Sequence, residues 1–179
     1  GADNLIGPLI CAGFGAMASL TIISAPTISI EAKTLWISQS LPVRGKDVLL
    51  AKADVHILMS LPFIVISAIL LEFTFDMTII SRIMILLFPL VVTIFNAYTG
   101  VALNLNYPKF DWVNETDAVK QGVAPFLAMF IAMATVALPV LLYAFLLSDL
   151  VSAEIYLCIV FLAFAAASAV LYRYLVTKG

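Results

Sequence analysis

Few residues of this sequence have side chains that could do chemistry. Its 179 residues include one histidine, His56, and two cysteines, Cys11 and Cys158. A single histidine excludes the HExxH zinc motif and any His-pair metal site, and no GxxxxGK[ST] loop for nucleotide phosphates occurs. Serine and threonine are common, but none is paired with a base and an orienting group as a nucleophile requires. We therefore expect no catalytic residue, no metal site and no cofactor on this chain.

These three side chains also have a plain structural interpretation. Cys11 and Cys158 both fall inside apolar runs, where a free cysteine behaves as a small buried hydrophobe, so no disulfide is expected. His56 follows a polar stretch at the start of an apolar run. We interpret it as a hydrogen-bonded interfacial histidine rather than a ligand or base.

Charge gathers instead in one polar stretch, Glu31–Asp54 (EAKTLWISQSLPVRGKDVLLAKAD), which holds four of the nine Lys and Arg residues. Apolar residues such as Trp36 are interspersed with these charges, which is typical of an amphipathic segment rather than a solvated loop. The pattern predicts two short helices joined by a Leu-Pro-Val-Arg-Gly turn. We expect the stretch to lie on the cytoplasmic face and to receive force from a partner protein.

The elements that position this stretch are membrane spans. Hydrophobic residues make up 64% of the chain, charged residues 11%, and the mean hydropathy is +1.14. Soluble domains have about 45–50% apolar and about 25% charged residues. Apolar runs of about 20 residues, the length needed to cross a bilayer, recur along the chain. The sequence predicts an all-α polytopic membrane protein with about five transmembrane helices and cytoplasmic amphipathic helices.

The spans form a single transmembrane domain over residues 1–179. The chain starts with Gly1 rather than Met and has no basic signal region, so we expect it to be a piece of a longer protein. Pro26 should break or bend the first span near its end. The expected spans are 5–28, 55–73, 79–103, 123–147 and 151–176, with cytoplasmic segments at 31–54 and 106–121.

The third span is unusually polar in its second half. Such side chains either hydrogen-bond to neighbouring helices or line a wet cavity, and we favour packing. The residues concerned are Thr93, Asn96, Tyr98, Thr99 and Asn104.

The second polar interval is Asn106–Gln121 (NYPKFDWVNETDAVKQ). Pro108 stops any preceding helix, and Asn114 is a candidate N-cap with acidic residues in the turn that follows. Its aromatic residues are expected to lie at the depth of the lipid headgroups, where such side chains are enriched. They are Tyr107, Phe110 and Trp112.

The distribution of basic residues predicts the orientation. If Glu31–Asp54 is inside, Arg82 alone lies outside, and this split follows the positive-inside rule. We therefore expect the N-terminus of this piece outside and its C-terminus inside. The residues on the inner side are Lys33, Arg44, Lys46, Lys52, Lys109, Lys120, Arg173 and Lys178.

Two segments resemble a known family. The first consists of Ser29 and the residues that follow it up to Asp54 (IEAKTLWISQSLPVRGKDVLLAKAD). It is similar to the cytoplasmic segment of bacterial ABC-2-type exporter permeases, which reads S-x-E-G-K, an aromatic residue, a Leu-Pro turn and a later Ala-Lys. Ala32 departs from that pattern, because the family usually has Gly there, which weakens any need for a sharp backbone feature. The matching positions are Ser29, Glu31, Lys33, Trp36, Leu41, Pro42, Ala51 and Lys52.

The second segment looks like a signature of a permease branch within that group, N-L-x-[FY]-P-K-x-[DE]-W-x-N-E-x-x-x-V-K-Q. It is the more specific motif, and with five spans the resemblance covers nearly the whole chain. The matching positions are Asn104, Leu105, Tyr107, Pro108, Lys109, Asp111, Trp112, Asn114, Glu115, Val119, Lys120 and Gln121.

The resemblance implies the C-terminal portion of a non-enzymatic permease subunit in the bacterial cytoplasmic membrane. A separate ATPase subunit would bind ATP and Mg²⁺, and its closure would push on the cytoplasmic helices. Other expected partners are the lipid bilayer and either the N-terminal remainder of the permease or a second copy, with no nucleic acid. The expected ATPase interface is Glu31, Lys33, Leu35, Trp36, Leu41, Pro42, Arg44, Lys46, Asp47 and Lys52.

Several alternatives stay open. The polar stretch could instead be a surface helix whose lysines bind anionic lipid. The second interval has two alternative roles, ATPase contact and a structural cap. The residues concerned are Pro108, Lys109, Asp111, Trp112, Asn114, Glu115 and Lys120. For the whole chain, the alternatives are a secondary transporter or channel fragment and a membrane scaffold without transport. We find no carboxylate at a mid-membrane position of the sequence, and this counts against a gradient-driven mechanism.

Overall fold

The computed structural model describes residues 3–40, 42–112 and 114–179, with the side chains of residues 3–5, 35, 38, 39, 115 and 118 excepted. Within these ranges there is no strand, which confirms the all-α prediction. A π-helical turn, η1 (Tyr143–Leu147), continues one of the long helices. The helices are α1 (Asp3–Ser19), α2 (Thr27–Ile30), α3 (Leu35–Ser40), α4 (Gly45–Thr74), α5 (Ile79–Asn106), α6 (Glu115–Lys120), α7 (Val123–Leu142) and α8 (Ala153–Lys178).

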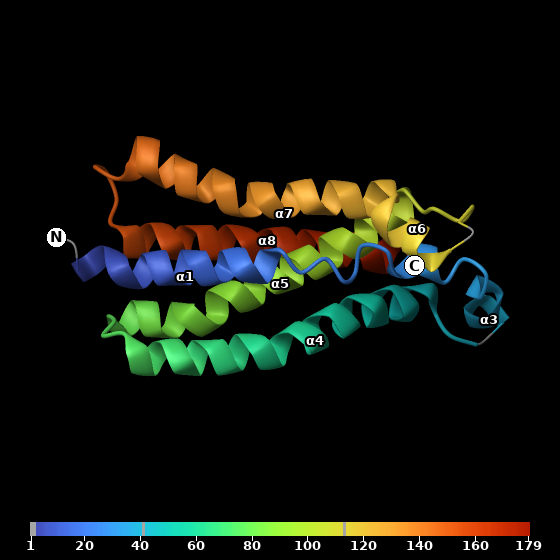
Figure 1. Cartoon of the computed structure of the whole chain (residues 1–179), viewed down its shortest axis with the longest axis horizontal. Helices are drawn as coiled ribbons and strands as arrows, with labels where there is room; N and C mark the ends of the chain where they lie inside the picture. Colours follow the sequence, from blue (N-terminus) through green and yellow to red (C-terminus); the bar gives the residue numbers. More distant parts are fainter. Residues whose placement is uncertain (1–2, 41, 113) are drawn as a thin grey trace.

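The long helices form an elongated bundle with α5 in its centre. α5 packs against α1, α4, α7 and α8, and the two chain ends lie at opposite ends of the bundle (Figure 1). In its apolar window 44% of the residues are buried, against 6% in α7. The core of the bundle is therefore built around one face of α5, and α7 is largely peripheral.

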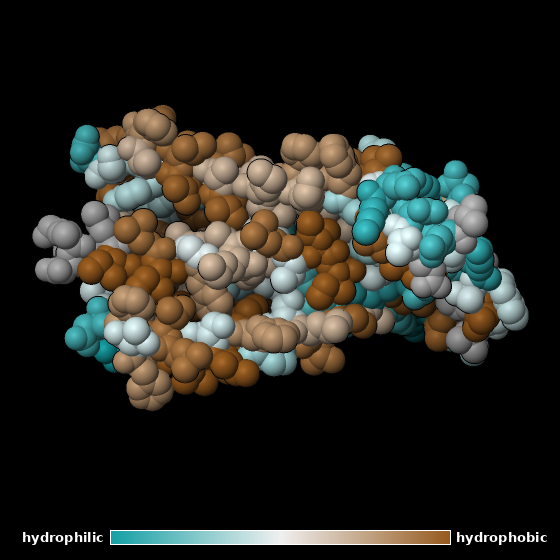
Figure 2. Space-filling model, viewed as in Figure 1, coloured by the Kyte–Doolittle hydropathy of each residue, from teal (hydrophilic) through white to brown (hydrophobic). Residues whose placement is uncertain are grey.

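Four helices, α4, α5, α7 with η1, and α8, are long and apolar enough to cross a membrane. α1 is apolar but shorter. Hydrophobic side chains cover most of the length of the bundle, and hydrophilic ones gather at the end that carries α3, α6 and the C-terminus (Figures 1 and 2). We call this the polar end.

The first expected span is interrupted. α1 ends at Ser19, nine residues before the expected end at residue 28, and residues 20–26 run without helix until α2 begins. The hydroxyl groups of Ser19 and Thr21 donate to the carbonyls of Ala16 and Ala18, both at 2.8 Å, which competes with helical continuation. Pro26 then lacks an N–H for a continuous helix.

The second half of the polar stretch also differs from the prediction. α3 is a short helix as expected, but the second helix is not separate, because α4 begins at Gly45, ten residues before the expected span at 55–73. The first turns of α4 are therefore amphipathic and continuous with a membrane-length helix. The third to fifth spans differ from their expected bounds by three residues or fewer.

Candidate functional site

The two polar intervals meet at Ser29 in α2. The side-chain carbonyl of Asn104 in α5 accepts the backbone N–H groups of Ile28 at 2.7 Å and Ser29 at 2.9 Å. Its amide group donates to the Ser29 hydroxyl at 2.6 Å. Asn104 is fully buried. It thus satisfies two N–H groups of the first turn of α2, which have no intrahelical partner.

The segment after α5 closes on the same serine. The backbone N–H of Lys109 donates to the Ser29 hydroxyl at 2.9 Å, and Trp112 Nε1 donates to the Ser29 carbonyl at 2.6 Å. Trp112 is buried, and its indole N–H has the hydrogen-bond partner that a buried tryptophan usually finds. We call Ser29, Asn104, Lys109 and Trp112 the Ser29 hub.

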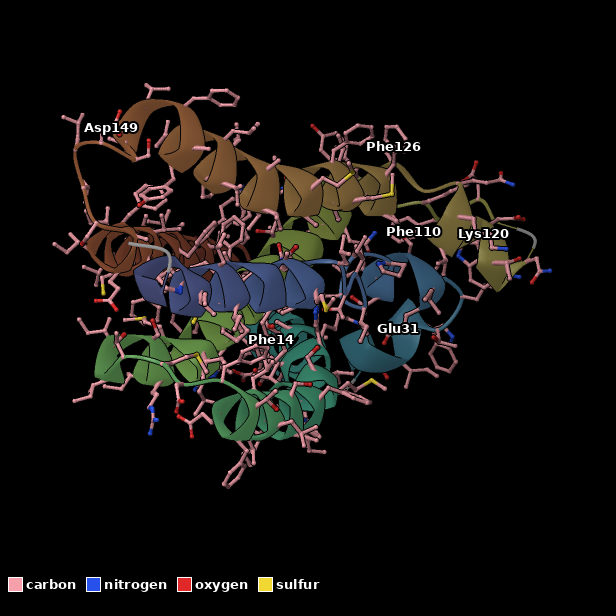
Figure 3. The ribbon with its side chains drawn as sticks, turned by 60° about the vertical axis from the view of Figure 1, so that its left-hand side comes forward. Phe14, Glu31, Phe110, Lys120, Phe126 and Asp149 are labelled. Atoms are coloured by element: carbon pink, nitrogen blue, oxygen red, sulfur yellow. The ribbon has the colours of Figure 1, made fainter. Side chains whose placement is uncertain are left out.

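Two charged contacts surround this hub. Lys52 of α4 pairs with Glu31, and the Lys52 side chain is only 9% exposed. The ammonium group of Lys33 lies 4.2 Å from the centroid of the Trp112 ring, within cation–π range. The connection from α2 to α3 is thereby tied both to α4 and to the segment after α5. Figure 3 shows Glu31, Phe110 and Lys120 together at the polar end.

These contacts divide the expected interface residues into two groups. Glu31, Lys33 and Lys52 are engaged around the hub. Lys46 is half-buried, and its backbone lies close to Gly179, the residue that follows α8. Leu41 lies outside the described residues, as does the side chain of Leu35. The exposed members are Trp36, Pro42, Arg44 and Asp47.

The second interval divides in the same way. Trp112 is buried and Lys109 is half-buried with its N–H bonded, which favours the structural cap for these two. Asn114 occupies the N-cap position of α6, and its N–H donates to Asp117 at 3.4 Å. The side chain of Glu115 lies outside the described residues. Pro108, Asp111, Asn114 and Lys120 are exposed.

Exposed apolar residues share the polar end with the exposed charges. Trp36 is 67% exposed, Ile37 45% and Val43 50%, at the polar end of the bundle. We call Trp36, Ile37, Pro42, Val43 and Arg44 the α3 surface. Sequence reasoning did not select Ile37 or Val43, although their position between charged residues was a usable signal. It quoted Ser29 only as a motif position, and it named Asn104 among the polar residues of the third span without a partner. A hydrogen-bond partner so distant along the chain leaves no local signature.

A second polar cluster lies at the interruption between α1 and α2. His56 of α4 is fully buried, and its Nδ1 and Nε2 lie 3.0 Å from the hydroxyls of Ser24 and Thr21. The Ser24 hydroxyl in turn donates to the carbonyl of Asn96 at 3.4 Å. Each ring nitrogen of His56 therefore has a hydroxyl oxygen within hydrogen-bond distance, which fits the expected hydrogen-bonded histidine. Its place is within α4 rather than at the start of a span.

Among the polar residues of α5, Asn96 and Asn104 hydrogen-bond to backbone of the α1–α2 segment, as the packing interpretation expected. The Asn96 amide donates to the Ser19 carbonyl at the end of α1, at 3.3 Å. The Thr93 hydroxyl donates to the Pro89 carbonyl at 2.8 Å. Thr99 differs, because its buried hydroxyl has no hydrogen-bond partner among the described residues.

The family described as "Membrane protein of 12 TMs" matches residues 10–178 of this chain. Comparisons with curated proteins and with solved structures find no match.

Proposed function

The chain belongs to the family described as "Membrane protein of 12 TMs", and from this premise we propose that it is a permease subunit of an ATP-binding cassette exporter. It is an integral membrane protein with several apolar helices in contact with the bilayer. On this proposal the chain is not itself an enzyme. A separate ATPase subunit binds ATP and Mg²⁺, and its hydrolysis cycle moves substrate across the membrane.

The observation that carries the proposal is the α3 surface. An indole that is 67% exposed at the polar end, flanked by Ile37, Val43 and the charge of Arg44, has the composition of a protein interface. Such interfaces combine an aromatic anchor with a polar, charged rim. Lipid headgroups are the rival ligand for the same surface, where a basic residue such as Arg44 contributes about 1 kcal/mol on anionic lipid.

The contacts behind the α3 surface provide a route for force. The turn after α3 leads directly into α4, a helix of 30 residues that reaches the opposite end of the bundle. The chain before α3 is held to α5 through the Ser29 hub and to α4 through Lys52. A push on α3 would therefore tilt α4 against α5 rather than move a loose loop.

The remaining parts of the proposal concern surroundings. The polar end faces the cytoplasm of a bacterium, with the N-terminus of this piece outside and the C-terminus inside. The description of the family counts twelve spans, whereas the described residues hold four long apolar helices and a shorter one. We assign the other spans to the N-terminal remainder of the permease or to a second copy.

The test is co-purification of a nucleotide-binding partner with the full-length protein in mild detergent. Arg44→Glu and Lys46→Glu reverse charge beside the Leu-Pro turn and should reduce the amount of bound ATPase severalfold, while membrane insertion stays normal. Arg82→Glu is the matched control, because Arg82 is exposed near the start of α5 and should leave the complex intact. An ATPase recovered equally with all three variants would contradict the proposal.

A further inference from the structure

A lateral groove of about 300 Å³ lies between α1 and α4. Its size is at the lower end of the range of small-molecule sites. Figure 3 shows Phe14 between these two helices, on the side of α1 that faces α4. The lining residues are Phe14, Met17, Ala18, Thr21, Ile23, Met59, Ser60, Phe63, Ile64 and Ser67.

The groove opens onto the apolar surface of the bundle. Two of its wall residues, Met17 and Phe63, are 73% and 74% exposed, so a ligand reaches it from the hydrocarbon phase. No Asp, Glu, Lys or Arg is among the described lining residues. A charged group would therefore enter without a counter-charge, at high cost inside a membrane. Methionine walls adapt to ligands of different shape.

One polar atom in the groove lacks a partner. Ser60, midway along α4, is 6% exposed, and its hydroxyl oxygen has no hydrogen-bond partner among the described residues. A buried polar group without a partner is unfavourable and rare. Thr21, whose hydroxyl lies 3.0 Å from His56 Nε2, lines the same groove. The floor of the groove thus offers an unused hydroxyl next to a polar cluster.

A second, smaller space lies at the interruption between α1 and α2. That space is lined by Ser19, Thr21, Ile22, Asn96 and Thr99 together with two alanines of α7. Thr21 lines both spaces, and the Thr99 hydroxyl is the other buried polar atom without a partner among the described residues. Non-helical backbone at membrane depth is tolerated where it is buried or lines a cavity. Here Thr21, in the non-helical stretch, lines both the groove and a smaller space with more polar residues.

We propose that this groove binds a membrane-soluble amphiphile with an uncharged hydroxyl or amide head. The apolar chain lies along Phe14, Met17, Met59 and Phe63, and the head bonds to the Ser60 hydroxyl beside Thr21. If the chain is the proposed permease, this ligand class is its transported substrate or a close analogue. Binding itself requires only the α1–α4 groove and no ATPase.

Photolabelling tests the proposal with two matched probes. The full-length protein, in lipid nanodiscs, is exposed to a long-chain alcohol that carries a diazirine and to the corresponding hydrocarbon without the hydroxyl. Labelled peptides are identified by mass spectrometry. The alcohol should label residues of α1 and α4 that line the groove, at lower concentration than the hydrocarbon does.

Two variants and a control sharpen the result. Ser60→Ala should weaken labelling by the alcohol about fivefold, the effect of one hydrogen bond, and leave the hydrocarbon unchanged. Ser67→Leu, at a half-buried lining position, should fill the groove and reduce labelling by both probes. Ser168→Ala is the control, because Ser168 is equally buried, at 6% exposure, but its hydroxyl already donates to Phe164.

Equal labelling by both probes, insensitive to Ser60→Ala, would overturn the proposal and identify an ordinary lipid-facing surface. Labelling confined to helices other than α1 and α4 would overturn it as well. The result is independent of the coupling proposal. Arg44→Glu should reduce ATPase recovery without changing the labelling, so failure of one proposal is distinguishable from failure of the other.

Discussion

At the scale of single residues, Asn104 makes three buried hydrogen bonds at the polar end. One side chain satisfies the N–H groups of Ile28 and Ser29 and orients the Ser29 hydroxyl. The same serine then holds Trp112 and Lys109. One neutral amide thus begins the set of contacts around Ser29, and the ion pair of Lys52 and Glu31 lies beside it.

Removal of this amide should destabilise the protein. Asn104→Ala leaves two buried backbone N–H groups without a hydrogen-bond acceptor, each at a cost of about 1–3 kcal/mol. We expect a clear drop in the thermal unfolding midpoint in mild detergent. Asn106→Ala is the control, since Asn106 is exposed and water replaces its bonds to Ala102 and Tyr174. Equal midpoints for the two variants would show that the hub is not needed for stability.

At the scale of elements, the interruption of the first span is the main departure from a simple bundle. The non-helical residues pack directly on α5, where Gly100 leaves room for them. A Cβ atom at position 100 would overlap the Ser24 hydroxyl and lie 2.9 Å from the backbone nitrogen of Ala25. The absence of a side chain at Gly100 is thus a condition for this close approach.

This close approach can be tested by adding one methyl group. Gly100→Ala should lower stability by about 1–3 kcal/mol, the usual cost of overpacking, because the obstacle includes backbone. Gly13→Ala is the matched control, since nothing lies within 4 Å of a Cβ there, and it should stabilise α1 by up to about 1 kcal/mol through helix propensity. Thermal unfolding in detergent measures both. A neutral Gly100→Ala would mean that residues 24–25 do not pack on α5 as described.

At the scale of the whole molecule, polarity is strongly asymmetric. α3, α6 and the C-terminus share one end of the bundle (Figure 1), and the hydrophilic surface gathers there (Figure 2). Of the nine Lys and Arg residues, all but Arg82 belong to segments of that end or to the last turns of α8. Such a distribution favours one orientation in the membrane, with the polar end in the cytoplasm.

Thiol labelling in intact cells tests this orientation. In a background with Cys11→Ala and Cys158→Ala, we introduce Arg82→Cys, Lys120→Cys and Lys178→Cys, all at exposed positions. A membrane-impermeant maleimide should label only the Arg82→Cys variant, and the other two should react only after the cells are permeabilised. Labelling of Lys120→Cys and Lys178→Cys from outside would reverse the orientation and remove the basis for a cytoplasmic ATPase contact.

Much of this architecture could be predicted from local composition. The apolar runs located the long helices to within a few residues at most ends, because bilayer thickness dictates their length. α3 ends at Ser40 and α4 begins at Gly45, on either side of the expected Leu-Pro turn, and Asn114 was correctly expected as an N-cap. Pro26 was also expected to disturb the first span. The extent of that disturbance, from residue 20 onward, depended on partners that α5 supplies.

The sequence alone determined the class of protein, since a chain with 64% hydrophobic and 11% charged residues has too little polar surface to fold in water. Only the tertiary structure decided which polar residues are available to a partner. Trp112 and Trp36 stand in similar amphipathic intervals, yet the first is buried on Ser29 and the second is exposed. The physical reason is that a buried hydrogen bond joins residues about 80 positions apart, and composition and periodicity report only on near neighbours.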